Sequence, residues 1–232
     1  MKRHIPNTIT CLNLFSGCLG IVFAFNGNLN YASYAILIAA VFDFLDGMFA
    51  RLLKAYSDIG KELDSLADMV SFGVLPSVII YQLFLLSSKH ESITWLPYSA
   101  FLIAVFSGLR LAKFNIDTRQ AEHFIGLPTP ANAMLIGSLP LILSQGSSFM
   151  STLIVSNYFL LILSIVMSLL LVAELPLISL KFKNLNIKDN LLRYVLVTGS
   201  VILFVIMQFA AVPLIIGLYV ILSFIEFRMI RR

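Results

Sequence analysis

The chain has 232 residues, of which 59% are hydrophobic and only 12% are charged, and its mean hydropathy is +0.94. A water-soluble domain carries about a quarter charged residues, so this composition excludes a soluble domain and indicates a protein embedded in lipid. The formal net charge of +4 requires no nucleic-acid partner, because membrane topology and attraction to anionic lipid headgroups account for it.

Apolar runs of about 17 to 25 residues can cross a bilayer, and eight such runs follow one another along the chain. They cover residues 7–26, 31–53, 62–87, 94–114, 128–145, 153–173, 192–208 and 211–229. The last two are joined so closely that they predict a helical hairpin. We therefore expect an all-α integral membrane protein, a bundle of about eight transmembrane helices. It forms a single domain over 1–232, with a core over about 1–180 and a hairpin over about 190–232.

Positive charge predicts how the bundle is oriented. With eight spans, fifteen of the sixteen basic residues fall on one side of the membrane, and only Lys89 falls on the other. Cytoplasmic loops are the ones rich in Lys and Arg. We therefore expect both termini, and the connection between the second and third spans, in the cytoplasm. In a bacterial cell the membrane would be the inner one.

The acidic residues are concentrated in one short stretch. Six of the twelve lie between positions 43 and 68: Asp43, Asp46, Asp58, Glu62, Asp64 and Asp68. Asp43 and Asp46 follow an apolar run, at membrane depth or at its cytoplasmic edge. A carboxylate inside a membrane costs at least about 2.5 kcal/mol, and such residues usually mark function.

The spacing of four of these acids predicts a metal site. Asp43 and Asp46 are three apart and Asp64 and Asp68 are four apart, so each pair shares one face of its helix. A short turn over 54–59 predicts antiparallel neighbouring helices, on which two carboxylates from each would converge. Such carboxylates repel one another unless cations are present. Ligands made only of oxygen suit Mg²⁺ or Mn²⁺, and two ions are the usual arrangement for displacement at phosphorus.

These acids have two other interpretations. In the first they form interfacial ion pairs with Arg51, Lys54 and Lys61, which accounts adequately for Asp58 and Glu62 but does not require four aligned aspartates. In the second the protein is a cation transporter. Acids on an ion path are expected near the bilayer midplane on broken helices, whereas these lie at the cytoplasmic end beside cationic side chains that would repel a permeating cation.

Residues 43–68 read D-x2-D-G-x2-A-R-x8-G-x3-D-x3-D. This pattern resembles the defining motif of the CDP-alcohol phosphatidyltransferase family at all eight fixed positions. Flanking stretches at 13–17, 64–76, 108–115 and 126–133 resemble its phosphatidylserine synthase branch, and together they cover roughly the first 135 residues. The resemblance implies a six-helix family core, here followed by a C-terminal hairpin, and suggests a homodimer.

The resemblance also implies a reaction. The phosphatidyl group of CDP-diacylglycerol, held among membrane lipids, would pass to the hydroxyl of L-serine with release of CMP. Asp43, Asp46, Asp64 and Asp68 would be metal ligands, and Asp68 would also be the general base. The expected CDP-lipid contacts are Asn7, Thr10, Gly47, Ala50, Arg51, Ser57 and Gly60. Glycerol 3-phosphate or inositol phosphate as acceptor, or an ether CDP-lipid as donor, stay open as alternatives.

Serine needs a cation for its carboxylate, and the cytoplasmic end of the fourth span offers several donors. The candidates are Arg110, Lys113 and Asn115, with Thr129 and Ser71 as further residues of the acceptor pocket. The same residues would also serve as topological anchors or helix-packing contacts. A phosphorylated acceptor would need a second phosphate-binding cluster, and this loop offers only Arg110, Lys113 and Arg119, which favours serine. Asn132 stands where the branch usually has a small residue.

Overall fold

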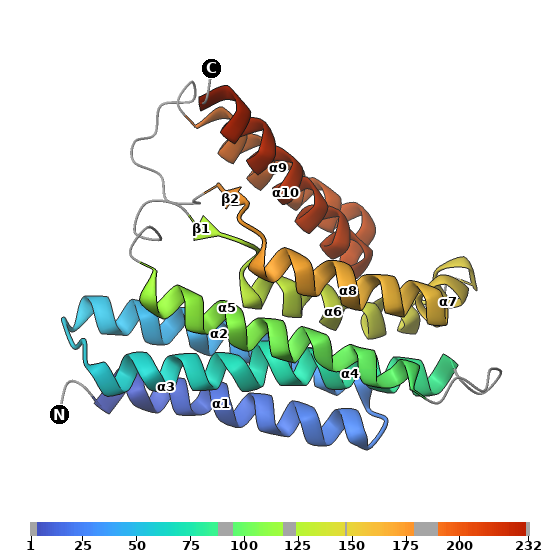
Figure 1. The fold of residues 1–232 in the computed structure, drawn as a ribbon, viewed down its shortest axis with the longest axis horizontal. Helices are drawn as coiled ribbons and strands as arrows, with labels where there is room; N and C mark the ends of the chain where they lie inside the picture. The colour runs from blue at the N-terminus through green and yellow to red at the C-terminus, as the bar shows by residue number, and fades with distance from the viewer. Residues whose placement is uncertain (1–3, 88–94, 118–123, 147, 179–189, 231–232) are drawn as a thin grey trace.

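The computed structural model of the protein describes residues 4–87, 95–117, 124–146, 148–178 and 190–230. The helices are α1 (His4–Phe25), α2 (Leu29–Leu52), α3 (Asp58–Asp68), π-helix η1 (Met69–Val74), α4 (Leu75–Ser87), 3₁₀ helix η2 (Leu96–Phe101), α5 (Leu102–Ile116), α6 (Thr129–Ser144), α7 (Ser148–Ile154), α8 (Asn157–Val172), α9 (Leu191–Met207), 3₁₀ turn η4 (Gln208–Ala210) and α10 (Ala211–Ile230). Two short strands, β1 (Phe124–Ile125) and β2 (Pro176–Leu177), complete the fold in Figure 1. The expected helical class is confirmed.

Each of the eight apolar runs contains helix. One of them is not the single continuous helix that was predicted. The run predicted as a single helix over 153–173 is broken between α7 and α8, which meet at a bend of 64°. The break falls at Val155 and Ser156, directly before Asn157, and Ser156 has an extended backbone. A β-branched residue followed by Ser and Asn is a weak helix former, because the polar side chains compete for backbone hydrogen bonds.

Several helices have the length and apolarity of membrane spans. Among the described residues four helices meet these criteria, or five if the bent α7–α8 pair counts as one span. The long C-terminal apolar run folds back on itself at Gln208, whose φ is +49°, so that α9 and α10 form the predicted hairpin (Figure 1). The chain is therefore a multi-pass membrane protein by the composition of its helices.

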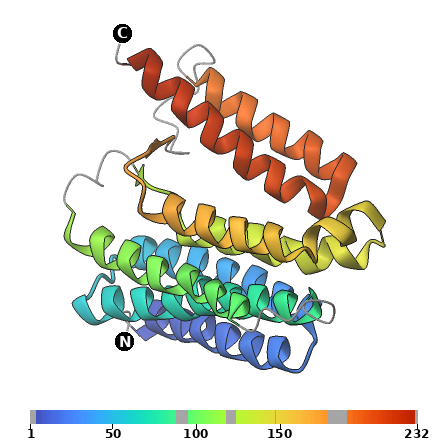
Figure 2. The ribbon, with the colours of Figure 1, turned by 45° about the vertical axis from the view of Figure 1, so that its right-hand side comes forward.

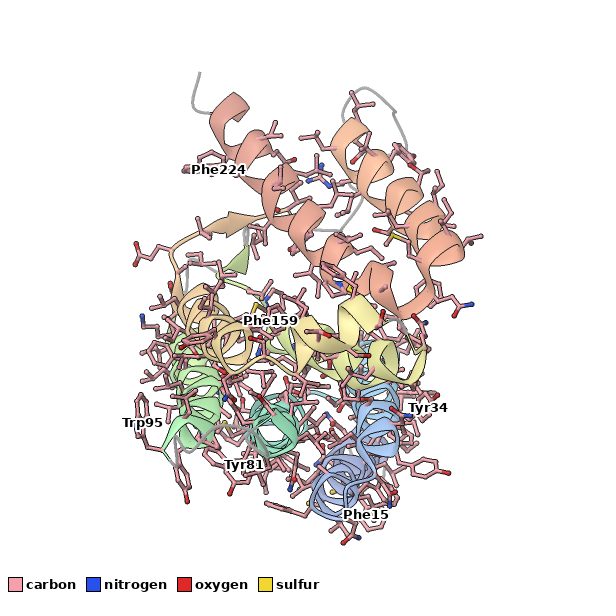
Figure 3. The ribbon with its side chains drawn as sticks, turned by 90° about the vertical axis from the view of Figure 1, so that its right-hand side faces the viewer. Phe15, Tyr34, Tyr81, Trp95, Phe159 and Phe224 are labelled. Carbon is pink, nitrogen blue, oxygen red and sulfur yellow. The ribbon has the colours of Figure 1, made fainter. Side chains whose placement is uncertain are left out.

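The outer faces of the helices carry large apolar side chains. Phe15, Tyr34, Trp95 and Phe224 point outward in Figure 3, and Phe15 is 59% exposed. Exposed apolar surface on this scale is not found on water-soluble monomers. Inside the bundle, small buried residues of α1 and α2, such as Ala24, Ala32 and Ala35, let these helices approach closely, as is common between helices in lipid.

The contacts between helices define a main bundle and a C-terminal hairpin beside it. Helix α1 packs against α2, α3 and α4, α2 packs against α6, and α5 packs against α8. The α9–α10 hairpin leans away from this bundle in Figure 2 and contacts it through α6 and β2. Strand β2 pairs antiparallel with β1, with Leu177 opposite Phe124.

Candidate metal and substrate site

The turn between α2 and α3 sets the two acidic helices against each other. Lys54 adopts a positive φ of 49°, and Ser57 caps α3, its Oγ accepting the Gly60 N–H at 3.1 Å. A serine cap of this kind stabilises a helix by about 1 kcal/mol. The two helices run in opposite directions, as expected, but they make few direct contacts with each other. Helix α1 packs against both of them, and the α2 and α3 side chains face each other across the site.

Three of the four aligned aspartates come together. Carboxylate oxygens of Asp43, Asp64 and Asp68 all lie within 4.8 Å of one another. Asp46 is not part of this cluster, because its Oδ2 accepts a hydrogen bond of 2.6 Å from the hydroxyl of Thr10 on α1. The sequence spacing placed Asp46 on the correct face, but it could not reveal a donor on a third helix.

The three-carboxylate cluster fits a divalent cation. Oδ1 of Asp64 is buried and has no hydrogen-bond partner among the described residues, and Asp68 accepts only a long bond of 3.4 Å from Asn13 Nδ2. Within the described part of the chain none of the three forms an ion pair with Lys or Arg. Three half-buried carboxylates this close together, none of them in an ion pair with another described residue, repel one another strongly. Their all-oxygen donor set suits Mg²⁺ or Mn²⁺, and the ion-pair interpretation does not describe them.

A cavity of about 520 Å³ adjoins the cluster, between α2 and α3 and against the start of α1. Asp46 and Asp64 form part of its wall. The structure brings to it all seven residues expected to contact a CDP-lipid, namely Asn7, Thr10, Gly47, Ala50, Arg51, Ser57 and Gly60. Tyr56, Lys61 and Phe114 line it as well. The cavity therefore combines cationic groups with an aromatic wall, beside the carboxylates.

The two glycines of the motif have different surroundings. A Cβ at Gly60 would lie 2.9 Å from Ser57 Oγ and 3.0 Å from Asn7 Oδ1, so this residue must be small for α3 to approach α1. A Cβ at Gly47 would meet only the Arg51 guanidinium, at 3.9 Å, and would otherwise enter the cavity. Gly60 therefore serves packing, whereas Gly47 keeps the cavity open beside the backbone.

Arg110 and Thr129 form a buried pair near the carboxylates. Nη1 of Arg110 donates to Thr129 Oγ1 at 3.4 Å, and the guanidinium carbon lies 5.7 Å from the centre of the Phe114 ring. The charge of Arg110 interacts with that of Asp68. Nε of Arg110 and both amide atoms of Asn132, one helical turn beyond Thr129, are buried without a partner among the described residues. Their hydrogen-bonding capacity is therefore unsatisfied within the described part of the chain.

The structure does not bring the other acceptor candidates to Arg110. Lys113 is on the exposed face of α5. The Asn115 amide donates to Ser65 Oγ at 2.9 Å, which ties the end of α5 to α3. The Ser71 hydroxyl donates to the Asn13 carbonyl at 3.0 Å, a packing contact between η1 and α1. Arg119 lies outside the described residues.

Sequence reasoning assigned no role to two residues that the structure places beside the site. Asn13 is fully buried and is the one described side chain that bonds Asp68. In the sequence, the feature that could have indicated this role is an amide side chain in the middle of an apolar run. Tyr219 on α10 lies within electrostatic range of Arg110. Nothing in its local sequence distinguishes it from an ordinary interfacial tyrosine.

Comparison with known proteins gives consistent matches. The model of the CDP-alcohol phosphatidyltransferase family matches residues 3–179. A CDP-diacylglycerol–serine O-phosphatidyltransferase of Bacillus subtilis is 38% identical over 164 residues, covering 67% of this chain and 88% of its own. One from Helicobacter pylori (strain 26695) is 32% identical over 224 residues, covering 95% of this chain and 90% of its own. The archaetidylserine synthase of Methanothermobacter thermautotrophicus is 38% identical over 136 residues, covering 58% and 56%.

Proposed function

The chain belongs to the CDP-alcohol phosphatidyltransferase family, and from that premise we propose that it transfers the phosphatidyl group of CDP-diacylglycerol to L-serine, giving phosphatidylserine and CMP. The observation that carries this proposal is the cluster of Asp43, Asp64 and Asp68 beside a cavity large enough for a nucleotide. The serine acceptor follows from the relatives, since the bacterial and the archaeal enzymes are all named for serine lipids.

The donor would lie with its acyl chains in the bilayer and its CDP group in the cavity. Arg51 can form charge-assisted hydrogen bonds to the pyrophosphate, and Gly47 and Ala50 let that group approach the α2 backbone. Asn7, Ser57 and Gly60 face the cavity from α1 and α3. Thr10 faces the cavity as well, and its hydroxyl also orients the Asp46 carboxylate.

In this proposal the aspartates are the metal ligands. Asp43, Asp64 and Asp68 would hold the divalent cation, Mg²⁺ or Mn²⁺, and Asp46 would complete a second position from its Thr10-bonded orientation. When bound, such cations neutralise the pyrophosphate and stabilise the charge that develops at phosphorus. Four carboxylates at the edge of a membrane are otherwise too costly to hold together.

Asp68 is the general base of the proposed reaction. The hydroxyl oxygen of serine forms a bond to the phosphorus that carries diacylglycerol, and the bond from that phosphorus to the CMP oxygen breaks. The hydroxyl proton passes to the Asp68 carboxylate. Asn13, which donates to Asp68 Oδ1, would keep this carboxylate turned toward the site.

The acceptor pocket would be formed by Arg110 and Thr129. A buried guanidinium with a free Nε can bind the serine carboxylate. Lys113, on the exposed face, serves here as a control. We expect Arg110→Lys to raise the KM for serine by about tenfold or more, as for a lost charge-assisted hydrogen bond, while Lys113→Ala leaves it within about twofold. Equal effects of the two substitutions would remove Arg110 from the pocket.

Topology and assembly complete the proposal. We propose about eight spans with both termini and the active site on the cytoplasmic side of the inner membrane, a single catalytic domain over 1–232, and a homodimer. The charge bias of the connecting loops supports the orientation. The helices α2 and α6 would be the shorter or more polar spans, since α2 carries the motif and α6 has only 16 residues.

The direct test is CMP release by the purified protein with CDP-diacylglycerol and each of serine, glycerol 3-phosphate and inositol phosphate. We expect metal-dependent CMP release with serine only. Release with one of the phosphorylated alcohols would keep the reaction class and change the acceptor. The same assay with an ether CDP-lipid tests the donor. Absence of metal-dependent CMP with every alcohol would contradict the enzyme proposal and favour ion transport.

A further inference from the structure

The α9–α10 hairpin lies beyond residue 179, where the match to the family model ends. It nevertheless contacts a segment of the chain that leads to the acceptor pocket. The match with the Helicobacter pylori relative covers 95% of this chain and so includes most of the hairpin. Leu196 is the one buried residue of helix α9. Helix α10, by contrast, directs polar side chains toward the rest of the protein.

Two side chains of α10 pair with both backbone groups of one residue after β2. The Tyr219 hydroxyl donates to the carbonyl of Ile178 at 3.0 Å. The Ile178 N–H donates to Ser223 Oγ at 3.1 Å, and the Ser223 hydroxyl donates in turn to the carbonyl of Tyr219 at 2.7 Å. Ile178 and Ser223 are both 2% exposed. We call this arrangement the Ile178 clamp.

The clamp is continuous with the segment that precedes α6. Strand β2, directly before Ile178, pairs with β1. Gly126 N–H donates to the Leu175 carbonyl and Leu127 N–H to the Leu170 carbonyl, both at 2.9 Å. Gly126 has a φ of +78°, and a Cβ there would lie 2.6 Å from the Leu171 carbonyl oxygen. The backbone of residues 124–127 is thereby fixed against the end of α8 and β2.

The fixed segment ends at the acceptor pair. Helix α6 begins at Thr129, whose hydroxyl accepts the bond from Arg110. Tyr219 packs against the main core as well as against the small cluster of Ile178, Leu196 and Leu222. Its hydroxyl is near enough to Arg110 for the two groups to interact electrostatically. A displacement of Ile178 would therefore reach Thr129, and through it Arg110, along the backbone of residues 124–127.

We propose that Tyr219 and Ser223 are positioning residues for the acceptor. By holding Ile178 they fix residues 124–129, and with them the Thr129 hydroxyl and the Arg110 guanidinium. This inference rests on the proposed function, because it assigns the hairpin to the acceptor half of the site. The donor cavity, built from α1, α2 and α3 with Phe114 of α5, has no contact with α10 among its lining residues.

The experiment measures KM for serine and for CDP-diacylglycerol separately in single-atom variants of the full-length protein. Tyr219→Phe and Ser223→Ala each remove one hydroxyl and keep the packing. One hydrogen bond contributes about 0.5–1.5 kcal/mol, which corresponds to a rise of about two- to tenfold in KM for serine. The KM for CDP-diacylglycerol and kcat are expected to change by less than about twofold, and the double variant to show the larger serine effect.

Two controls separate positioning from general stability. Thr198→Val, on α9, removes a hydroxyl that bonds only carbonyls of its own helix, at 2.7 Å to Tyr194, and should leave both KM values unchanged. Ser223→Thr keeps a hydroxyl and should restore most of the serine affinity. If Tyr219→Phe fails to accumulate in the membrane, Ser223→Ala and Ser223→Thr provide the same comparison.

The outcomes that would overturn the inference are specific. An unchanged KM for serine in the double variant would do so, and so would an equal rise in both KM values together with a lower thermal midpoint. If the wild-type protein releases CMP with another alcohol, the serine assignment fails and the inference is judged on the KM for that alcohol. If it releases CMP with none, the inference falls with the proposed function.

Discussion

The two ends of the chain use polar side chains for different purposes. In α1–α3, carboxylates, amides and hydroxyls gather at and beside a cavity, and two of their buried atoms, Asn13 Oδ1 and Asp64 Oδ1, have no partner within the described protein. In α10, the inward hydroxyls of Tyr219 and Ser223 are fully engaged with backbone atoms. Unpartnered groups mark where ligands bind, and satisfied groups mark what holds the binding surface in place.

This difference predicts how each end responds to substitution. Loss of a carboxylate at the α2–α3 end removes a charge from the proposed metal site. Loss of a hydroxyl at the hairpin end removes one neutral hydrogen bond, and the rest of the contact survives. The expected effects therefore fall from several orders of magnitude to less than twofold along the following series.

The largest effect is expected for Asp43→Asn and Asp64→Asn. Removing one charge from the cluster weakens cation binding, which contributes several kcal/mol to stabilising the transition state, so CMP release should fall by about a thousandfold or more. Asp58→Asn and Glu62→Gln are the matched controls, since both acids are exposed and outside the cluster. Activity within about twofold of wild type in either cluster variant would contradict the metal-site assignment.

Asp68→Asn should separate chemistry from binding. The amide cannot accept the serine proton, so turnover should again fall by about a thousandfold. Binding of CDP-diacylglycerol, measured by equilibrium binding of a labelled donor, should be partly retained, because the cavity lining does not include Asp68. Full turnover in this variant would reject the general-base role.

Thr10→Val tests a contact that only the structure revealed. The hydroxyl of Thr10 bonds the buried Asp46 carboxylate at 2.6 Å, and a hydrogen bond to a charged group contributes about 1.5–3 kcal/mol. We expect kcat/KM for CDP-diacylglycerol to fall by roughly tenfold or more. Thr10→Ser, which keeps the hydroxyl, should be nearly normal. Equal losses in both variants would show that packing of the methyl group matters instead.

The smallest effect is expected at the hairpin's ion pair. Arg193 Nη1 and Glu226 Oε1 lie 3.3 Å apart, with both side chains partly exposed. Such pairs contribute about 0–1 kcal/mol. Glu226→Gln should therefore shift the thermal midpoint in detergent by only a few degrees and leave CMP release unchanged. A large loss of activity would mean that this end of the hairpin takes part in the site.

The sequence predicted much of the site because charge is costly in a membrane. Acids such as Asp43 and Asp64 in an apolar chain need a functional reason, and their helical spacing then predicted which faces they share. The positions of the helices followed from apolar run lengths. The one broken run, at Val155 and Ser156, lacked a proline or glycine that would have signalled it.

What the sequence could not predict depended on contacts between distant helices. Thr10 forms a hydrogen bond to Asp46, which lies outside the cluster, and α1 packs against both acidic helices. Neither of these contacts follows from periodicity within one helix. Of the acceptor candidates, Lys113 and Arg110 are equivalent by charge and position, and only the packing of α5 buries one and exposes the other. Tyr219 is more than a hundred positions from Arg110, with no motif to connect them.

The central claim is that Asp43, Asp64 and Asp68 bind divalent cations on which the transfer to serine depends. The most direct test strips the purified wild-type protein with a chelator and measures serine-dependent CMP release as Mg²⁺ or Mn²⁺ is returned. We predict no turnover in the stripped protein and full recovery on adding back the metal, with no recovery in Asp64→Asn. Undiminished turnover by the stripped protein would contradict the account.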